Sequence, residues 1–183
     1  MRLTPLLLLL GMVASCGAAD SRRTTHENAD QRAPRFNAEA RALDGDTVSV
    51  DFRLLGIDAF ERKQLCQRDG ACWACGKAAQ DFAARQVRDA SAAFTLTPNK
   101  TYGRPVATVT VAGKDLGETM IRAGLAIPAM KYLRNDPGLA SSYAAAYDAA
   151  ERGHVGAHVG TWLDPAKWRR GERLECERHR LYE

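Results

Sequence analysis

The sequence has no long apolar run and no strong charge of one sign. The apolar stretch near its start, Leu6–Val13, is too short to span a bilayer as a finished helix. The net charge is only +4, which is compatible with a polyanionic partner but does not select one. With 45% apolar and 26% charged residues, the 183-residue chain can form one domain with a core plus appendages.

The first residues are predicted to be a signal rather than part of the fold. Met1-Arg2 gives a positive start before the apolar run, so residues 1–15 fit a secretory signal peptide. The run ends in Val13-Ala14-Ser15-Cys16, which resembles the bacterial lipobox. Cleavage before Cys16 would leave a lipid-modified N-terminus. A plain signal with a stray cysteine is the alternative.

The segment after the signal is predicted to be a tether. Residues 16–37 combine the lipidated Cys16 with a polar stretch that has one proline and almost no large apolar side chain. Gly17, rather than aspartate, does not indicate retention in the inner membrane. In a Gram-negative cell we therefore expect export to the cell envelope and anchoring in the outer membrane, on its periplasmic or surface face.

Charged residues gather in the stretch Leu43–Glu61 among β-forming residues. They are Asp44, Asp46, Arg53, Asp58 and Glu61. If the backbone is extended, Asp44 and Asp46 share one face of a strand. Hard oxygen ligands suit Ca²⁺ or Mg²⁺ rather than zinc. A cation beside an arginine and a spare carboxylate is suited to phosphoryl chemistry.

The spacing of Arg53 and Asp58 needs a break in the strand. The two residues are five positions apart, which places them on opposite faces of a regular strand. They converge only if the strand ends or kinks between them, and Gly56 is placed to allow that. The alternative is that Asp-Gly-Asp is an ordinary turn and that Arg53 and Asp58 form a surface ion pair.

Motifs along the chain follow one order and spacing. They are DGDT at 44–47, RLLGID at 53–58, Glu61, CGKAA at 75–79, Tyr102-Gly103-Arg104, DLGETMIRAGLA at 115–126 and Gly160-Thr161-Trp162. Together they resemble the staphylococcal nuclease-like (thermonuclease) family over roughly residues 38–170.

The resemblance and the patterning predict one fold. Strands are expected at 38–43, 47–57, 94–97 (stopped by Pro98-Asn99) and 106–111, with a short extended piece at 126–132; helices are expected at about 75–90, 116–123 and 139–152. The class is α+β, mainly β. The resemblance implies a five-stranded OB-fold, a Greek-key barrel with about three packed helices, over 38–170. Residues 171–183 form a charged C-terminal tail.

The resemblance also implies a catalytic site. Asp46, Asp58 and the backbone carbonyl of Ala59 would hold one Ca²⁺ ion, with Asp44 close by through water. Glu61 would orient or deprotonate the attacking water. Arg53 and Arg104 would neutralise charge on the phosphate. The implied activity is hydrolysis of phosphodiesters in DNA, with RNA as a second substrate, leaving 3′-phosphate ends, by a protein expected to be monomeric.

Further residues are assigned by position or depart from the family pattern. Tyr102 and Tyr132 match tyrosines of the family's nucleotide pocket. Relatives have more residues between the DGDT and Arg53, so the hairpin here is either very tight or replaced by one bent strand. Phe60 stands where relatives have proline, and we expect a looser backbone before Glu61.

Four cysteines lie beyond the signal: Cys66, Cys72, Cys75 and Cys176. An even set in an oxidising compartment predicts disulfides, but three pairings are possible. The resemblance implies Cys66–Cys75, which leaves Cys72–Cys176. The Cys-x-x-Cys at 72–75 also has the spacing of a redox motif or half a zinc site. His154 and His158 have metal-ligand spacing for a helix, but the glycines around them favour a surface loop.

Two other functions stay open at this stage. The short hairpin and Phe60 favour a non-catalytic OB-fold lipoprotein that binds nucleic acid or a protein partner. A disulfide-stapled envelope protein with only a structural role is the third alternative. The presence of Arg53, Glu61 and Arg104 together argues for the nuclease, because binding alone does not need a glutamate facing a phosphate.

Overall fold

The computed structural model describes residues 36–179. The predicted signal peptide, the predicted lipidation site Cys16 and nearly all of the predicted tether lie outside these residues. Among the residues described, no helix combines the length and apolar character needed to cross a membrane.

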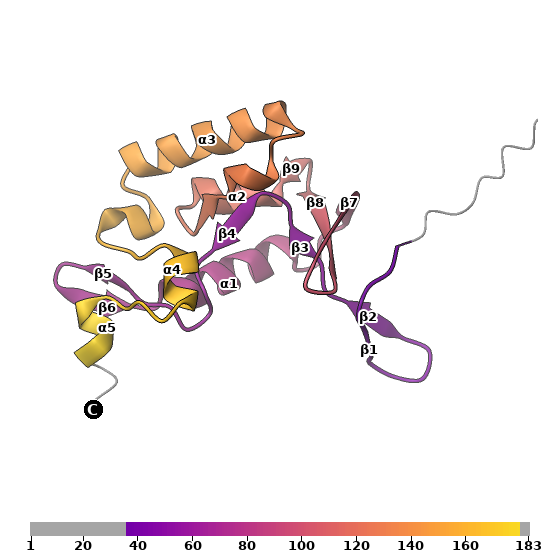
Figure 1. Cartoon of the computed structure of the whole chain (residues 1–183), viewed down its shortest axis with the longest axis horizontal. Coiled ribbons are helices and arrows are strands. Elements are labelled where there is room, and N and C mark those ends of the chain that lie inside the picture. The colour runs from indigo at the N-terminus through magenta and orange to yellow at the C-terminus, as the bar shows by residue number, and fades with distance from the viewer. Residues whose placement is uncertain (1–35, 180–183) are drawn as a thin grey trace, which may run out of the picture. The chain divides into compact units, whose positions relative to one another are not determined.

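Short strands and helices alternate along the chain in an α+β arrangement, as predicted (Figure 1). The strands are β1 (Ala40–Ala42), β2 (Val48–Val50), β3 (Arg53–Leu54), β4 (Ile57–Ala59), β5 (Cys66–Arg68), β6 (Ala71–Trp73), β7 (Ala92–Thr101), β8 (Arg104–Val111), β9 (Lys114–Asp115) and β10 (Ala126–Pro128). The helices are α1 (Cys75–Val87), α2 (Leu116–Arg122), α3 (Pro137–Arg152), α4 (Pro165–Arg169) and α5 (Glu175–His179), with single 3₁₀ turns at Met130–Tyr132 and Gly156–Val159.

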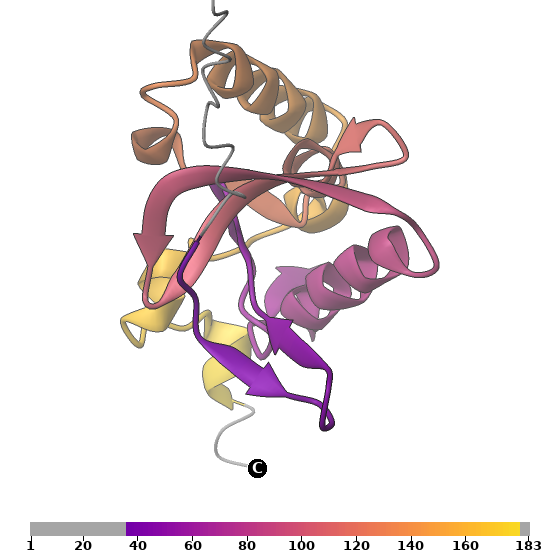
Figure 2. The same cartoon turned by 90° about the vertical axis from the view of Figure 1, so that its right-hand side faces the viewer.

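The long β7–β8 hairpin is the centre of the sheet structure (Figure 2). β3 joins β8 in parallel, with Arg53 opposite Val106, and β9 extends the other end of β8. β4 pairs separately with β10. The predicted stop of the strand at Pro98-Asn99 is wrong, because β7 passes this point through a register shift between Leu96 and Lys100. A bulge of this kind keeps a proline inside a hairpin strand.

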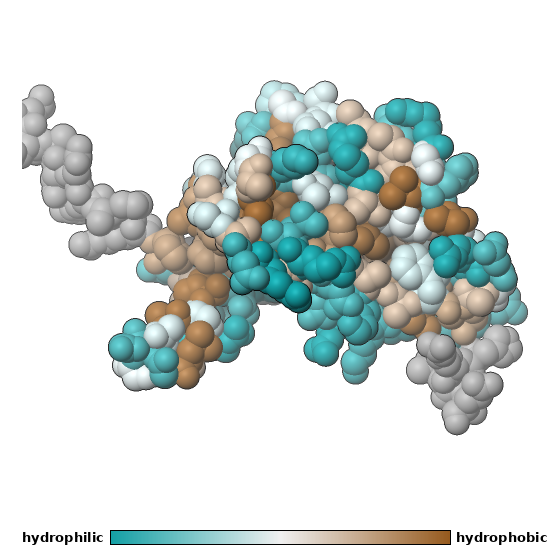
Figure 3. All heavy atoms as spheres, turned by 180° about the vertical axis from the view of Figure 1, so that it is seen from behind, coloured by the Kyte–Doolittle hydropathy of each residue, from teal (hydrophilic) through white to brown (hydrophobic). Residues whose placement is uncertain are grey.

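The β1–β2 hairpin stands apart from the rest of the sheet structure (Figure 1). Among the described residues its strands pair only with each other, although the Glu39 backbone N–H donates to the Gly103 carbonyl at 3.2 Å. Leu43 and Val48 are 66% and 67% exposed on it, and Figure 3 shows apolar surface on this lobe at lower left. After β2 the chain enters β3 and β4 in two other ladders. The bent-strand alternative is therefore closer to the structure than a tight hairpin.

The three predicted helices form as α1, α2 and α3, whereas the short helices α4 and α5 were not predicted. Asp115 caps α2 by accepting a 2.8 Å bond from the Glu118 N–H. Leu116, Met120 and Ile121 of α2 are buried. α2 lies between α1 and α3, and Tyr143 of α3 donates its hydroxyl proton to the cap carboxylate at 2.8 Å (Figure 1). Burial and this bond raise the pKa of the Tyr143 phenol.

Both predicted disulfides are confirmed: Cys66–Cys75 and Cys72–Cys176. The cysteines of the Cys-x-x-Cys segment belong to different bridges, so the redox and zinc alternatives are wrong. The second bridge joins β6 to α5 across 104 residues of sequence.

Most of the histidine segment lies at the surface, as predicted, but His158 is partly covered. The His158 ring packs edge-on against Tyr147 and Trp162, at centroid distances of 5.0 and 5.6 Å. Burial lowers the pKa of His158, so the ring favours its neutral form. Within residues 36–179, no three side chains of histidine, cysteine or acidic type are grouped to hold a metal.

Candidate active site

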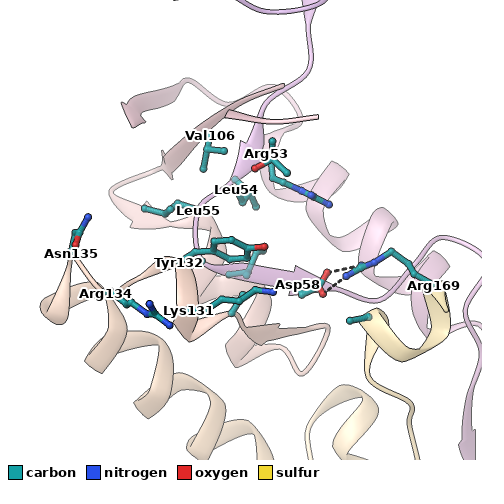
Figure 4. Close-up of a pocket in the computed structure, with 15 residues that line it drawn as sticks. Arg53, Leu54, Leu55, Asp58, Val106, Lys131, Tyr132, Arg134, Asn135 and Arg169 are labelled. Carbon is teal, nitrogen blue, oxygen red and sulfur yellow. Dashed lines mark hydrogen bonds and ion pairs between the residues drawn. The ribbon is translucent and has the colours of Figure 1, made fainter. Parts of the chain in front are cut away.

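A pocket of about 430 Å³ opens beside β3 and β4 (Figure 4). Its walls come from those strands, from the ends of β7 and β8, from the turn at 129–135 and from α4. Charged side chains in its lining are one carboxylate and four cations: Asp58, Arg53, Lys131, Arg134 and Arg169. This balance favours an anionic ligand, because clustered cations concentrate counter-charge in a concave site.

A break at Gly56 brings Arg53 and Asp58 to one pocket, as predicted. β3 ends at Leu54 and β4 begins at Ile57, with Gly56 between them at φ +70°. A side chain at Gly56 would be strained at this φ, and its Cβ would lie 2.3 Å from the buried Leu133 side chain. Glycine is therefore required at the point where the two functional side chains converge.

Arg169 of α4 joins the two carboxylates at the end of β4. Its Nη1 donates to Asp58 Oδ1 at 2.9 Å and to Glu61 Oε1 at 2.7 Å, and its Nη2 donates to Asp58 Oδ2 at 2.6 Å. These bonds raise the pKa of the guanidinium above its ordinary value, mainly through Asp58. Arg53 forms no ion pair with Asp58 in the part of the chain described, so the surface-pair alternative is wrong.

The backbone of Glu61 is held by the side chain of a buried glutamine, Gln64. The Glu61 N–H donates to Gln64 Oε1 at 3.0 Å, and Gln64 Nε2 donates to the Leu163 carbonyl at 2.6 Å. Gln64 is fully buried, and Phe60 is 4% exposed against Trp162. The expected loosening of the backbone before Glu61 stays a prediction, and the apolar packing of Phe60 acts against it.

Arg104 and Tyr102 are not among the residues that line the pocket, although Arg104 pairs with the lining residue Thr101. Arg104 begins β8, two residues before the lining residue Val106, so both occupy one face of the strand. Tyr102 lies in the β7–β8 turn at 85% exposure. Tyr132 lines the pocket, and Lys131 Nζ lies 4.8 Å from its ring centroid.

Asp44 and Asp46 lie in the exposed turn of the β1–β2 hairpin. The Asp46 N–H donates to Asp44 Oδ1 at 3.3 Å, and the Thr47 hydroxyl donates to Asp46 Oδ1 at 3.0 Å. Side-chain hydrogen bonding with Thr47 and Asp46 lowers the pKa of Asp44. The turn interpretation describes this conformation, and the structure does not bring these carboxylates to Asp58 (Figure 1).

The carboxylates at β4 nevertheless have the chemistry of a hard-cation site. Asp58 and Glu61 already converge on one positive group, the Arg169 guanidinium. Ala59, whose carbonyl is the further predicted ligand, ends β4 next to Asp58. Carboxylate and carbonyl oxygens are the ligands that Ca²⁺ prefers. The donors fit such an ion, but the guanidinium occupies them in this conformation.

Sequence reasoning missed Arg169, Lys131 and Arg134. The contacts of Arg169 span 111 and 108 residues to Asp58 and Glu61, and no local pattern reports a contact of that length. Lys131 and Arg134 flank Tyr132, which was itself predicted to line a pocket. Proximity to that tyrosine was the available signal.

Comparison with known protein families matches residues 51–162 to the family described as Staphylococcal nuclease homologue. The match covers more than half of the chain, which therefore belongs to this family, and its fold is an OB-fold. A search of curated proteins found no match. The matched segment contains Arg53, Asp58, Glu61 and Arg104, whereas the hairpin aspartates and Arg169 lie outside it.

Proposed function

We propose that the protein is a nuclease that hydrolyses phosphodiester bonds of DNA, and of RNA as a second substrate, leaving 3′-phosphate ends. The observation that supports this most directly is that Arg53 and Asp58 line one cation-rich pocket and that Glu61 shares the Arg169 guanidinium with Asp58. Family membership supports a nucleic-acid substrate, since this family is one of nucleases.

In this proposal, different side chains act on the phosphate of the substrate and on the attacking water. Arg53 at the pocket wall, with Arg104 opposite the lining residue Thr101, would neutralise charge developing on the phosphate oxygens. Glu61, fixed by Gln64, would orient or deprotonate the attacking water. Lys131 and Arg134 form no ion pairs within the described residues, so they remain available for neighbouring phosphates.

A single Ca²⁺ would be held by Asp58 and the Ala59 carbonyl, with Asp46 as a ligand and Asp44 through water once the hairpin approaches. The ion would supply positive charge beside the phosphate. The observation behind this part is the pair of carboxylates that already holds a cationic group.

For the location we propose export to the cell envelope, with a lipid anchor at Cys16 and a monomeric state. The support is the sequence Val13-Ala14-Ser15-Cys16 after a signal-like start. Replacement of Cys16 by serine should release the protein from membranes, and continued membrane fractionation would exclude the anchor.

The test of activity incubates the purified protein with single- and double-stranded DNA, and with RNA, in Ca²⁺, Mg²⁺ or chelator. Glu61→Gln and Arg104→Ala should each lower turnover by about 10²–10⁴-fold, while Glu151→Gln, an exposed glutamate on α3, serves as the matched control. Cleavage by both site variants at the wild-type rate would refute the site. Salt-sensitive binding without cleavage in any metal would establish the OB-fold binding module instead.

A further inference from the structure

The C-terminal segment, residues 163–179, lies beyond the family match yet reaches the centre of the site. Asp164 caps α4 by accepting a 2.6 Å bond from the Ala166 N–H, and Pro165 begins the helix in a fully buried position. Arg169, at the last position of α4, is thereby directed to the carboxylates at the end of β4 (Figure 4).

Contacts on both sides of α4 fix its position. Before it, the buried Gln64 side chain holds the Leu163 carbonyl. Residues that follow the helix hold Trp168 near its end. Trp168 Nε1 donates to Glu177 Oε1 at 2.9 Å, and the Arg173 guanidinium lies 4.0 Å from the Trp168 ring centroid. The Cys72–Cys176 disulfide then ties α5 to β6. The segment is thus anchored at two ends, independently of the ion pairs of Arg169.

The anchored arginine takes up both oxygens of Asp58 and one of Glu61. The proposed divalent cation needs the Asp58 oxygens, and two cations cannot both keep full contact with one carboxylate. The next residue, Arg170, is an arginine that does not contact Asp58 or Glu61 and so serves as a control. Arg170 points to Glu172, at 3.8 Å, and its side chain is 63% exposed.

We propose that the C-terminal segment is an internal competitor for the cation site: Arg169 occupies Asp58 and Glu61 until a divalent cation displaces it. This inference rests on the proposed function for the identity of the cation. Displacement costs the charge-assisted bonds of Arg169, so the site fills at a higher cation concentration than the carboxylates alone would require. Loosening of the segment, above all by breaking Cys72–Cys176, lowers that concentration.

The test is a calorimetric titration of Ca²⁺ into wild-type protein, Arg169→Gln and Arg170→Gln. Arg169→Gln should bind Ca²⁺ about tenfold or more tightly, because it removes charge-assisted bonds to the ligands. Arg170→Gln should match the wild type. The double variant Cys72→Ser/Cys176→Ser, checked for its fold by circular dichroism, should change the Kd in the same direction by a smaller factor.

Each result has a distinct meaning. Equal Kd values for wild type and Arg169→Gln overturn the competition while the nuclease proposal stands. Weaker binding by Arg169→Gln overturns it too, and shows that Arg169 supports the ion. Absence of Ca²⁺ binding by every variant overturns both the competition and the calcium part of the function. Lower turnover with an unchanged Kd overturns the competition in favour of a direct role on the phosphate.

Discussion

Asp58 in the pocket wall and Glu61 beside it are fixed by long-range contacts, whereas Asp44 and Asp46 lie in the exposed turn of a hairpin whose strands, among the described residues, pair only with each other. The first pair is held by a kinked strand, a buried glutamine and an arginine from the far end of the sequence. The second pair is held by bonds between neighbours in the turn.

The difference separates two ways in which a chain positions a functional group. Long-range packing fixes the carboxylates at β4 before any ligand arrives, although under the proposed competition a cation must first displace Arg169 from Asp58. Local turn bonds fix only the shape of the hairpin tip. Under the proposed Ca²⁺ ligand set, Asp46 would have to be brought to Asp58 by movement of the whole hairpin.

The largest expected effect is on kcat, and it should differ between Arg53 in the pocket and Arg41 in the hairpin. Arg53→Ala should lower kcat by about 10²–10³-fold, because the pocket loses a preorganised donor for the phosphate. Arg41→Ala, on β1, should change kcat by about threefold or less, since it removes only an exposed pair with Asp51. Steady-state kinetics on DNA measure both. Equal losses would show that the hairpin is part of the catalytic surface.

The second effect concerns stability. Gly56→Ala should lower the free energy of unfolding by about 2–4 kcal/mol, because it adds left-handed strain to overpacking against Leu133. Gly45→Ala, in the hairpin turn, has open space around it and should stay within about 0.5 kcal/mol. Urea unfolding followed by circular dichroism gives both values. A small loss at Gly56 would mean that the kink is not needed for the fold.

Several parts of this contrast could be predicted from the sequence. Asp115 before an amphipathic run predicts the start of α2, and the spacing of Arg53, Gly56 and Asp58 predicts the break between β3 and β4. These features depend on residues close together in the chain. The two disulfides followed from a family resemblance, because four cysteines alone allow three pairings.

Other parts depend on tertiary contacts that no short window contains. Arg169 meets Asp58 only because a disulfide and a buried glutamine fix the C-terminal segment. The hairpin turn of Asp44 and Asp46 has the same local sequence whether it lies beside β4 or away from it. The continuation of β7 past Pro98 depends on a bulge that its partner strand accommodates.

The third effect tests whether the hairpin closes. Asp46→Asn should weaken Ca²⁺ binding about tenfold, because the ion loses one charged ligand. Asp51→Asn changes a carboxylate of the same hairpin that pairs with Arg41, and should leave the Kd unchanged. Calorimetry on both variants decides between the two positions of the hairpin. A wild-type Kd for Asp46→Asn would make the ligand prediction wrong and leave the hairpin aspartates as turn residues.

The smallest effect concerns the flank of the pocket next to Tyr132. Lys131→Ala and Arg134→Ala should each reduce the slope of log K against log salt for single-stranded DNA by about 0.7, the value for one lost phosphate contact. Binding is measured in Glu61→Gln protein, so that the substrate stays intact. Arg41→Ala is the hairpin comparison and should leave the slope unchanged. A reduced slope for Arg41→Ala would show that the hairpin contacts the bound DNA. The difference between the hairpin and the pocket would then hold only for the protein without bound DNA.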